Sequence, residues 1–198
     1  GHLRRLTAPE TGRTAAMLPG MAKRICVFCG SAPGARPVYG EAAARLGRRL
    51  AERGLGLVYG GASVGTMGVL ADAALAAGGE VVGVMPRSLV DREVAHDGLA
   101  ELHVVEGMHE RKALMTALSD GFLTLPGGFG TLDELFEALS WAQLGLHGSK
   151  VALWNLAGYW DPLLAMLDRA VAEGFLRPEH RARLWADEAL ETLLDHLA

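Results

Sequence analysis

Short apolar segments alternate with amphipathic ones along the chain from residue 23 onward. Six of the apolar segments predict β-strands, at 24–29, 55–59, 80–85, 101–105, 121–125 and 150–154. Helical spacing of apolar residues predicts helices at 38–53, 65–77, 108–118, 131–144, 160–173 and 187–197. Nearly continuous apolar strands separated by helices are typical of a parallel sheet that is covered on both faces. With right-handed crossovers, the pattern predicts an α/β fold with a doubly wound parallel sheet, a Rossmann-like three-layer sandwich.

Residues 1–21 lack this pattern. They contain scattered Arg, Thr, Pro and Gly, no apolar stretch long enough for a signal peptide, and a leading Gly-His pair typical of a tag remnant. We therefore expect a flexible N-terminal tail at 1–21. No repeat, low-complexity block or linker interrupts the remainder, so residues 22–198 are expected to form a single domain.

Composition and charge exclude several classes of protein. Half of the 198 residues are hydrophobic and the net charge is −4, so the basic footprint of a duplex nucleic-acid binder is missing. No apolar run approaches the roughly 20 residues of a membrane-spanning helix. The two cysteines are too few to staple a fold of this size and suit a reducing compartment. We expect a cytoplasmic protein that binds neither nucleic acid nor membrane.

Cys26 and Cys29 have the spacing of a redox-active pair, but they lie in a segment with the pattern of a buried strand. Residues three apart in a strand point to opposite faces of the sheet, so the two thiols are not expected to meet. The seven His residues show no ligand spacing with Cys or carboxylates. The sequence therefore predicts no dithiol centre, no metal site and no cofactor.

Glycine-rich turns follow three of the expected strands. They are Gly30-Ser31-Ala-Pro-Gly34, Gly60-Gly61-Ala-Ser63-Val-Gly65 and Pro126-Gly-Gly-Phe-Gly-Thr131. Ligands of open parallel sheets bind beyond the carboxyl ends of the strands, and a turn that opens a helix offers N–H groups to a phosphate. One such turn is uninformative, because glycine is common in any tight turn. Three at one sheet edge predict a site for a phosphate-bearing ligand, although neither the dinucleotide fingerprint nor the P-loop is present.

Two charged residues near these turns have both a structural and a functional interpretation. Arg111 shares a helix face with apolar residues such as Met115, where an unpaired guanidinium would be costly. Arg111 either forms a structural ion pair, or binds a ligand or orders a catalytic carboxylate. Glu134 follows Thr131 at the spacing of a capping box, yet its carboxylate would also stand beside the phosphate site. A carboxylate there would repel phosphate unless it addressed another part of the ligand, such as a sugar.

The same segments resemble a known family. Pro126-Gly-Gly-Phe-Gly-Thr131-Leu-Asp-Glu134 resembles the PGGxGTxxE motif of the LONELY GUY (LOG) family of cytokinin riboside 5′-monophosphate phosphoribohydrolases, long misannotated as lysine decarboxylases. Met108-His-Glu-Arg111-Lys112 resembles the family's second signature, and Asp91-Arg92-Glu93 is a further match. The similarity extends from about residue 24 to about residue 176. It implies a nucleotide-binding domain that hydrolyses the N-glycosidic bond of N6-substituted adenosine 5′-monophosphates to free base and ribose 5-phosphate.

The resemblance also implies roles for individual residues. Glu134 and Arg111 would form the catalytic pair, with Arg92 as a second arginine. The other implied residues contact the nucleoside 5′-monophosphate substrate: Ser31, Gly61, Glu93, Lys112, Gly127, Gly128, Phe129, Gly130, Thr131, Leu132, Asp133 and Ser140. Members of this short type are homodimers whose active sites draw on both subunits, so a homodimer is expected.

Two alternative functions stay open. A broader nucleosidase would cleave AMP or other nucleoside monophosphates, because base preference depends on pocket walls that the sequence does not place. A non-catalytic carrier would hold a nucleotide or the molybdenum cofactor on the same fold, although a carrier has no need of the Arg111 and Glu134 pair. Lysine decarboxylation is disfavoured, since it normally uses pyridoxal phosphate on a lysine and the chain contains only Lys23, Lys112 and Lys150.

Overall fold

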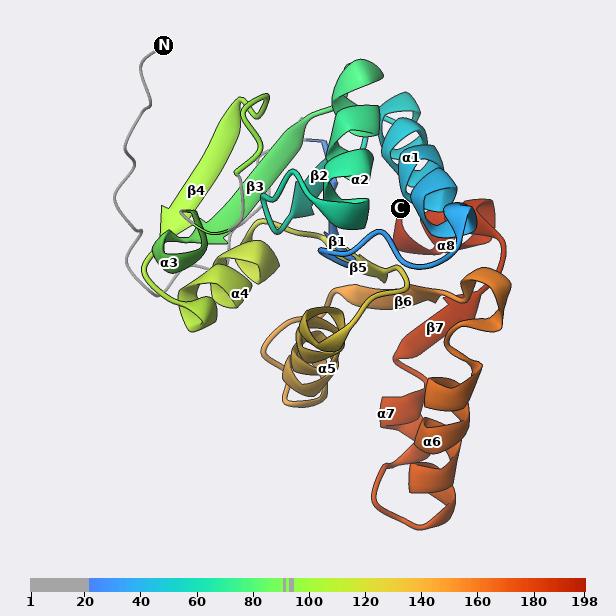
Figure 1. Ribbon diagram of the computed structural model, residues 1–198. Helices are drawn as coiled ribbons and strands as arrows, with labels where there is room; N and C mark the ends of the chain where they lie inside the picture. Colours follow the sequence, from blue (N-terminus) through green and yellow to red (C-terminus); the bar gives the residue numbers. More distant parts are fainter. Residues whose placement is uncertain (1–21, 91, 93–94) are drawn as a thin grey trace.

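The sheet of the computed structural model is entirely parallel, with strand order β4-β3-β2-β1-β5-β6-β7 (Figure 1). The structure describes residues 22–90, 92 and 95–198, so the expected tail at 1–21 and the candidate Glu93 lie outside it. The strands within the described ranges are β1 (Arg24–Phe28), β2 (Gly56–Tyr59), β3 (Val81–Pro86), β4 (Glu101–Val105), β5 (Gly121–Thr124), β6 (Lys150–Trp154) and β7 (Leu184–Asp187). Because β1 lies between β2 and β5, the chain winds outward in both directions from the centre of the sheet.

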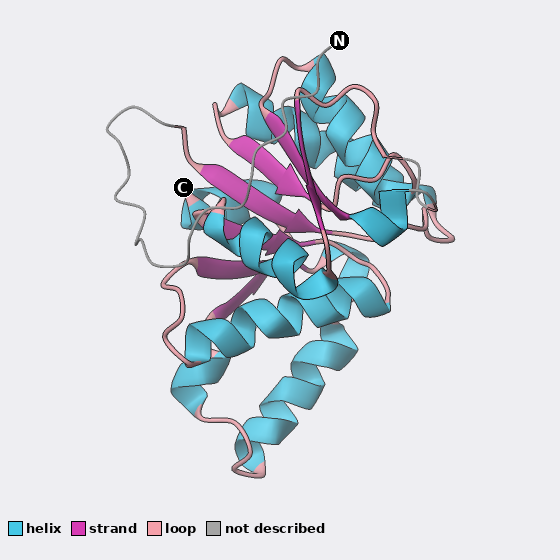
Figure 2. Cartoon of the chain, turned by 90° about the vertical axis from the view of Figure 1, so that its left-hand side faces the viewer, coloured by secondary structure: helices cyan, strands magenta, loops and turns pink. Residues whose placement is uncertain are grey.

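Helices cover both faces of this sheet (Figures 1 and 2). They are α1 (Pro37–Glu52), α2 (Gly65–Ala76), α3 (Arg87–Val90), α4 (Met108–Ala117), α5 (Phe129–Gln143), α6 (Asp161–Ala172), α7 (Pro178–Arg181) and α8 (Leu190–Leu197), with a 3-10 turn at Leu156–Gly158. Helices α1, α2 and α8 lie on one face, and α4 and α5 lie on the other, while α6 and α7 extend away from the sheet (Figure 1). The predicted doubly wound α/β sandwich is confirmed.

Strand β1 divides the core between the two faces. Ile25 and Val27 belong to the apolar cluster beneath α1, α2 and α8, whereas Phe28 belongs to the cluster beneath α4 and α5. Cys26 lies in the second cluster and Cys29 in the first, and both are buried free thiols. This alternation is what the pleat of a strand imposes. The prediction that the two thiols would not meet is confirmed.

The largest difference from the predicted elements is at the C-terminal end of the chain. Strand β7 occupies 184–187, where a loop and the start of a helix were expected, and α8 begins only at Leu190. β7 pairs with β6 at the edge of the sheet, with Leu184 opposite Val151. Of its four residues only Leu184 is fully buried, so the segment lacks the apolar run that identifies a central strand.

None of the helices in the described ranges combines the length and the apolar character needed to cross a membrane. Within the same ranges, no group of three or more His, Cys, Asp or Glu side chains is arranged to hold a metal ion.

Candidate active site

The three glycine-rich loops meet at the carboxyl ends of β1, β2 and β5. A Cβ atom added to Gly30 would lie 3.6 Å from the Cα of Gly127, so the first and third loops are in contact. A Cβ added to Gly65, whose φ is +61°, would lie 2.3 Å from the carbonyl carbon of Ser31, so the first and second loops are also in contact. Only glycine tolerates this approach of two backbones. The loops surround the point where the direction of winding reverses, which is where doubly wound sheets bind their ligands.

The two glycine loops that open helices differ in what they offer a ligand. The carbonyl oxygen of Gly30 accepts hydrogen bonds from the N–H groups of Thr66 and Met67, at 3.1 and 3.4 Å. The first turn of α2 is thus closed by the first loop, so this glycine turn has a structural role. At α5, no side chain caps Gly128, and the N–H groups of residues 129–131 have no acceptor in the described part of the chain. The N-terminus of α5 is therefore open to an anion.

Arg111 is buried and is held in place by backbone carbonyl groups. Its Nε donates to the carbonyl oxygen of Val84 at 3.0 Å and its Nη2 to that of Gly60 at 3.0 Å, which ties α4 to the ends of β3 and β2. A Cβ added to Gly60 would lie 2.2 Å from Nη2, so glycine is required for this contact. Among the described residues Arg111 forms no ion pair, so the structural ion pair considered above is not found. Within the described residues, no carboxylate side chain pairs with this guanidinium.

Glu134 does not belong to a capping box. Helix α5 begins three residues earlier than that interpretation requires: its N-cap is Gly128 instead of Thr131, so Thr131 is its third residue and Glu134 its sixth. Thr131 instead is buried against Gly127, where an added Cβ would lie 2.1 Å from the Thr131 Oγ1. The capping-box interpretation is therefore wrong. The Glu134 carboxyl is not used by the helix backbone.

The environment of Glu134 disfavours its charged form. Burial raises the pKa of this carboxyl from 4.5 to about 7, and the negative charges of Asp133 and Glu137 act in the same direction. The positive charges of Arg111 and Lys112 oppose this effect only in part. No hydrogen bond or ion pair holds the Glu134 carboxyl within the described residues. A proton-transferring carboxyl with a pKa near neutrality is characteristic of catalytic sites.

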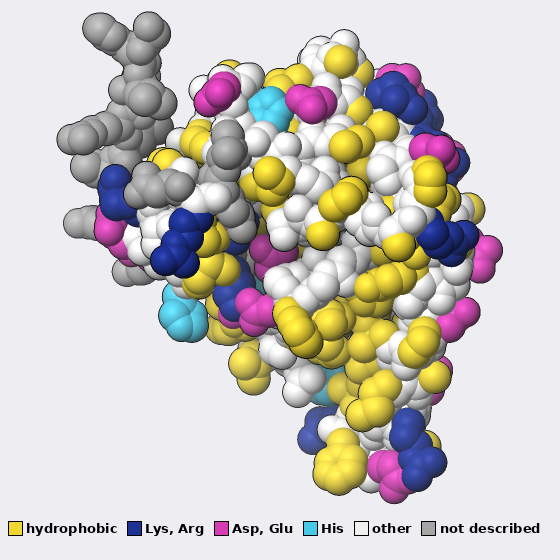
Figure 3. Space-filling model, viewed as in Figure 1, with side chains coloured by type: hydrophobic (Ala, Val, Ile, Leu, Met, Phe, Trp, Pro, Cys, Tyr) yellow, Lys and Arg dark blue, Asp and Glu magenta, His cyan; other side chains and the backbone are white. Residues whose placement is uncertain are grey.

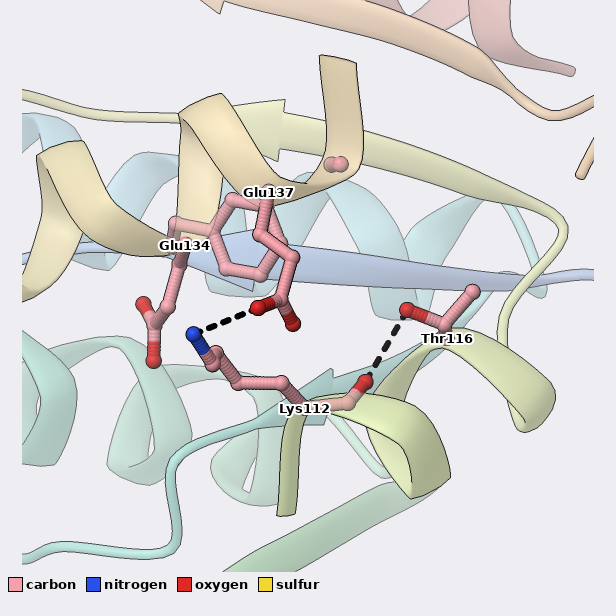
Figure 4. A pocket seen from close by; sticks show the side chains of 6 residues that line it. Lys112, Thr116, Glu134 and Glu137 are labelled. Atoms are coloured by element: carbon pink, nitrogen blue, oxygen red, sulfur yellow. Dashed lines mark hydrogen bonds and ion pairs between the residues drawn. The ribbon is translucent and has the colours of Figure 1, made fainter. Parts of the chain in front are cut away.

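A small pocket between α4 and α5 exposes this carboxyl (Figure 4). The pocket is lined by Phe28, Lys112, Thr116, Glu134, Glu137 and Ala138. Lys112 extends from α4 toward α5, and its Nζ lies 2.6 Å from Glu137 Oε2 and 3.0 Å from Asp133 Oδ2. In Figure 4 the Lys112 ammonium lies between the carboxyl groups of Glu134 and Glu137. The pocket therefore holds a cluster of opposite charges.

The structure brings some of the candidate residues together and leaves others apart. Glu134 and Lys112 line one pocket, and Gly127 to Thr131 form the adjoining start of α5. Gly61 is buried in its turn, with φ +81°, and its carbonyl oxygen accepts the His96 N–H at 3.1 Å.

The remaining candidates make no contact with the pocket. The side chains of Ser31, Arg92, Phe129 and Ser140 are exposed, and Phe129 is 93% exposed. Leu132 packs against the core cluster beneath α4 and α5, and its N–H donates to the Gly128 carbonyl oxygen at 3.0 Å. Arg92 uses its backbone N–H to bond the Leu89 carbonyl oxygen, but its side chain has no partner in the described ranges.

Several pocket residues were not identified from the sequence. Glu137 follows Glu134 by three residues, and this spacing on a helix places the two carboxylates on one face, which was a usable signal. Phe28 and Ala138 appear in the sequence only as apolar core positions. The Tyr159 hydroxyl donates to the Gly127 carbonyl oxygen at 2.8 Å, a contact between segments far apart that no local pattern indicates.

The chain is similar to a protein family and to several of its characterised members. A family model described as "Possible lysine decarboxylase" matches residues 67–197. The chain is 50% identical over 159 residues to the cytokinin riboside 5′-monophosphate phosphoribohydrolase LOG of Oryza sativa subsp. japonica, covering 80% of this chain and 66% of that protein. It is 52% identical over 163 residues to the cytokinin riboside 5′-monophosphate phosphoribohydrolase of Rhodococcoides fascians, covering 82% of each chain.

Solved structures of the same fold include a molybdenum cofactor binding protein. The protein from Rippkaea orientalis matches with a TM-score of 0.67 at 24% identity, over 89% of this chain and 96% of that chain. This likeness concerns the fold.

Proposed function

The chain belongs to the LOG family of cytokinin riboside 5′-monophosphate phosphoribohydrolases, and on that premise we propose that it hydrolyses N6-substituted adenosine 5′-monophosphates to the free base and ribose 5-phosphate. The observation that carries the proposal is the Glu134 carboxyl, with its pKa raised to about 7, on the helix whose N-terminus is open. The open N–H groups suit the phosphate, and the carboxyl suits the sugar one helical turn away. This arrangement resolves the conflict between an anionic ligand and an anionic side chain.

The proposed reaction uses the two charge states of Glu134. Breaking the bond between C1′ and the base nitrogen leaves positive charge on the ribose, which a nearby carboxylate stabilises. The base nitrogen leaves with the electron pair of the broken bond. The carboxylate accepts a proton from the water whose oxygen bonds to C1′, and this proton is passed on to the base nitrogen, directly or through solvent. With a pKa of about 7, the carboxyl is ionised in a substantial fraction of molecules at neutral pH and still binds a proton well.

Arg111 supports this reaction without transferring a proton. Guanidinium groups stay protonated in proteins, which makes them poor general acids. Fixed by two carbonyl groups before substrate arrives, Arg111 is preorganised to stabilise negative charge on the departing base or to orient Glu134. We propose that Arg92 supplies a second positive charge at the active site.

The proposed substrate contacts fall into two groups. The backbone of Gly127, Gly128, Phe129, Gly130 and Thr131 would hold the phosphate at the start of α5. Ser31, Gly61, Glu93, Lys112, Leu132, Asp133 and Ser140 would contact the remainder of the nucleotide. Two free, buried thiols suit a reducing cytoplasm, where we place the reaction.

The protein is further proposed to act as a homodimer whose active sites draw on both subunits. Large hydrophobic side chains are exposed along α5, the loop after it and α6 with the turn that follows: Phe129, Phe136, Leu144, Leu146, Met166 and Phe175. Figure 3 shows hydrophobic side chains gathered over α5, α6 and the region between them. Contiguous apolar patches of this kind mark interaction surfaces. Because α5 also carries Glu134, a partner on this surface would lie close to the pocket.

Incubation of the purified protein with isopentenyladenosine 5′-monophosphate or AMP, followed by chromatography of the free base, tests the proposed activity. Base should be released from the isopentenyl substrate, and Glu134→Gln should abolish the release. Glu173→Gln provides a matched control, because Glu173 is an exposed residue at the end of α6. The ratio of the two rates separates a cytokinin enzyme from a broader nucleosidase. Nucleotide binding without release of either base would contradict the proposal and favour a carrier.

A further inference from the structure

Glu137 lies in the pocket without a role in the proposed reaction. We propose that Glu137 is a positioning residue that acts through Lys112: it holds the Lys112 ammonium away from a direct pairing with Glu134 and so controls the charge state in which Glu134 meets the substrate. The effect of Glu137 on catalysis rests on the proposed function, but its effect on the titration of Glu134 can be measured in the free protein.

The ion pairs of Lys112 identify Glu137 as its main anchor. The Lys112 Nζ lies 2.6 Å from Glu137 Oε2 and 3.0 Å from Asp133 Oδ2. The side chains of Lys112 and Glu137 are only 11% and 18% exposed, whereas that of Asp133 is 56% exposed. A charge pair that is shielded from water interacts more strongly than one that is open to it. The Glu137 pair therefore fixes the position of the ammonium.

The competition between two carboxylates for one cation follows from helix geometry. Glu134 and Glu137 are three residues apart on α5 and share a face, and both line the pocket that Lys112 enters (Figure 4). The ammonium forms its ion pairs with Glu137 and Asp133, and none with Glu134. Glu137 thus affects Glu134 twice, through its own negative charge and through the cation that it retains.

The charges around Glu134 are balanced as the structure stands. Helix α4 contributes the positive Arg111 and Lys112, and α5 contributes the negative Asp133 and Glu137. The thiols of Cys26 in β1 and of Cys29 directly after it are kept neutral by burial, which raises the pKa of each, to about 12 for Cys29. Asp91 and Glu93 lie outside the described residues. Neutralising Glu137 leaves one excess positive charge facing Glu134 and frees Lys112 to pair with it.

The test measures the titration of Glu134 directly, by carboxyl ¹³C NMR of the free protein. Glu137→Gln should move this titration to lower pH by about one unit, the size typical of a newly available opposite charge within a few ångströms. Glu137→Asp keeps the negative charge but shortens the side chain, so it should give a smaller shift in the same direction. Glu173→Gln should leave the titration unchanged.

A double-mutant cycle decides whether the effect passes through Lys112. In a Lys112→Met background, Glu137→Gln should shift the Glu134 titration by less than half as much as it does in the native sequence. Equal shifts in both backgrounds, or no shift in either, would overturn the inference. If the proposed function holds, the ascending limb of the pH profile of kcat/KM moves with the NMR titration. Absence of base release by the native protein would contradict the proposed function and would leave the NMR cycle able to decide the role of Glu137.

Discussion

Replacing Glu134 by Gln should abolish activity and yet stabilise the folded protein at neutral and alkaline pH. The folded state raises the pKa of this carboxyl from 4.5 to about 7, chiefly through burial, so it binds the proton more tightly than the unfolded chain does. Between these two pH values the folded protein loses stability as pH rises, because only the unfolded state releases the proton freely. Below this window the carboxyl is neutral in both states and contributes nothing. Above it, the full cost of burying the charge is present.

The magnitude follows from the same two values. A change from 4.5 to about 7, at about 1.4 kcal/mol per pH unit, corresponds to about 3 kcal/mol. Water that reaches the half-buried side chain reduces this figure, so we expect the Gln variant to gain about 1–3 kcal/mol above pH 7. This gain is large against the roughly 5–15 kcal/mol that stabilise a typical domain.

Urea unfolding followed by tryptophan fluorescence at pH 4.5 and pH 8 measures this difference. At pH 8 the Gln variant should have a higher midpoint at an unchanged slope, and at pH 4.5 the two proteins should coincide. Glu173→Gln, which alters an exposed carboxylate directly after α6, should show no such dependence on pH. A Gln variant that is less stable at both pH values would refute the reasoning, because the carboxylate would then be making a structural contact.

Two further predictions concern residues around the pocket. Gly60→Ala would place a Cβ 2.2 Å from the Arg111 Nη2, so kcat/KM for base release should fall on the order of 100-fold. Gly40→Ala on α1 is the control: its added Cβ would have no atom within 4 Å, so kcat/KM should not change. An unaltered kcat/KM for Gly60→Ala would show that the guanidinium position is unimportant. Phe136→Glu on α5 and Leu144→Glu directly after it place charge on the exposed apolar surface, so they should convert a dimer to a monomer in size-exclusion chromatography with light scattering. A native protein that already elutes as a monomer would contradict the proposed dimer.

Much of the fold was predictable because burial on both faces leaves a strong local pattern. The strands around β1 are almost wholly apolar, and each predicted strand agrees with the structure to within one residue at either end. β7 was not predictable in this way, because an edge strand needs apolar residues on one face only and its four residues bury a single side chain. Its position depends on the partner strand β6, which the local sequence does not encode.

The parts of the candidate site that backbone turns form could be predicted from the sequence. The parts that depend on contacts between distant segments were harder to predict. Glycine turns at strand ends carry their own signal, and their convergence follows from the parallel sheet. The contact of the Gly30 carbonyl with the first turn of α2 could not be predicted, because it depends on the path of a loop 36 residues away from Thr66. The pairing of Lys112 with Glu137 could not be predicted either, because it depends on the distance between α4 and α5 on the face of the sheet.

Glu134 shows why the position of a helix boundary matters to function. In a capping box the carboxylate accepts a hydrogen bond from the N-cap backbone N–H in the first turn of the helix. Because the N-cap of α5 is Gly128 and not Thr131, the Glu134 carboxyl is not held in this way and is available for other chemistry. Because α5 begins early, Glu134 lies one turn deeper, beside buried apolar groups such as Phe28 and close to Arg111. The same displacement leaves the first N–H groups of α5 without acceptors. Both halves of the proposed site, the anion-binding end and the tuned carboxyl, therefore follow from the position at which one helix starts.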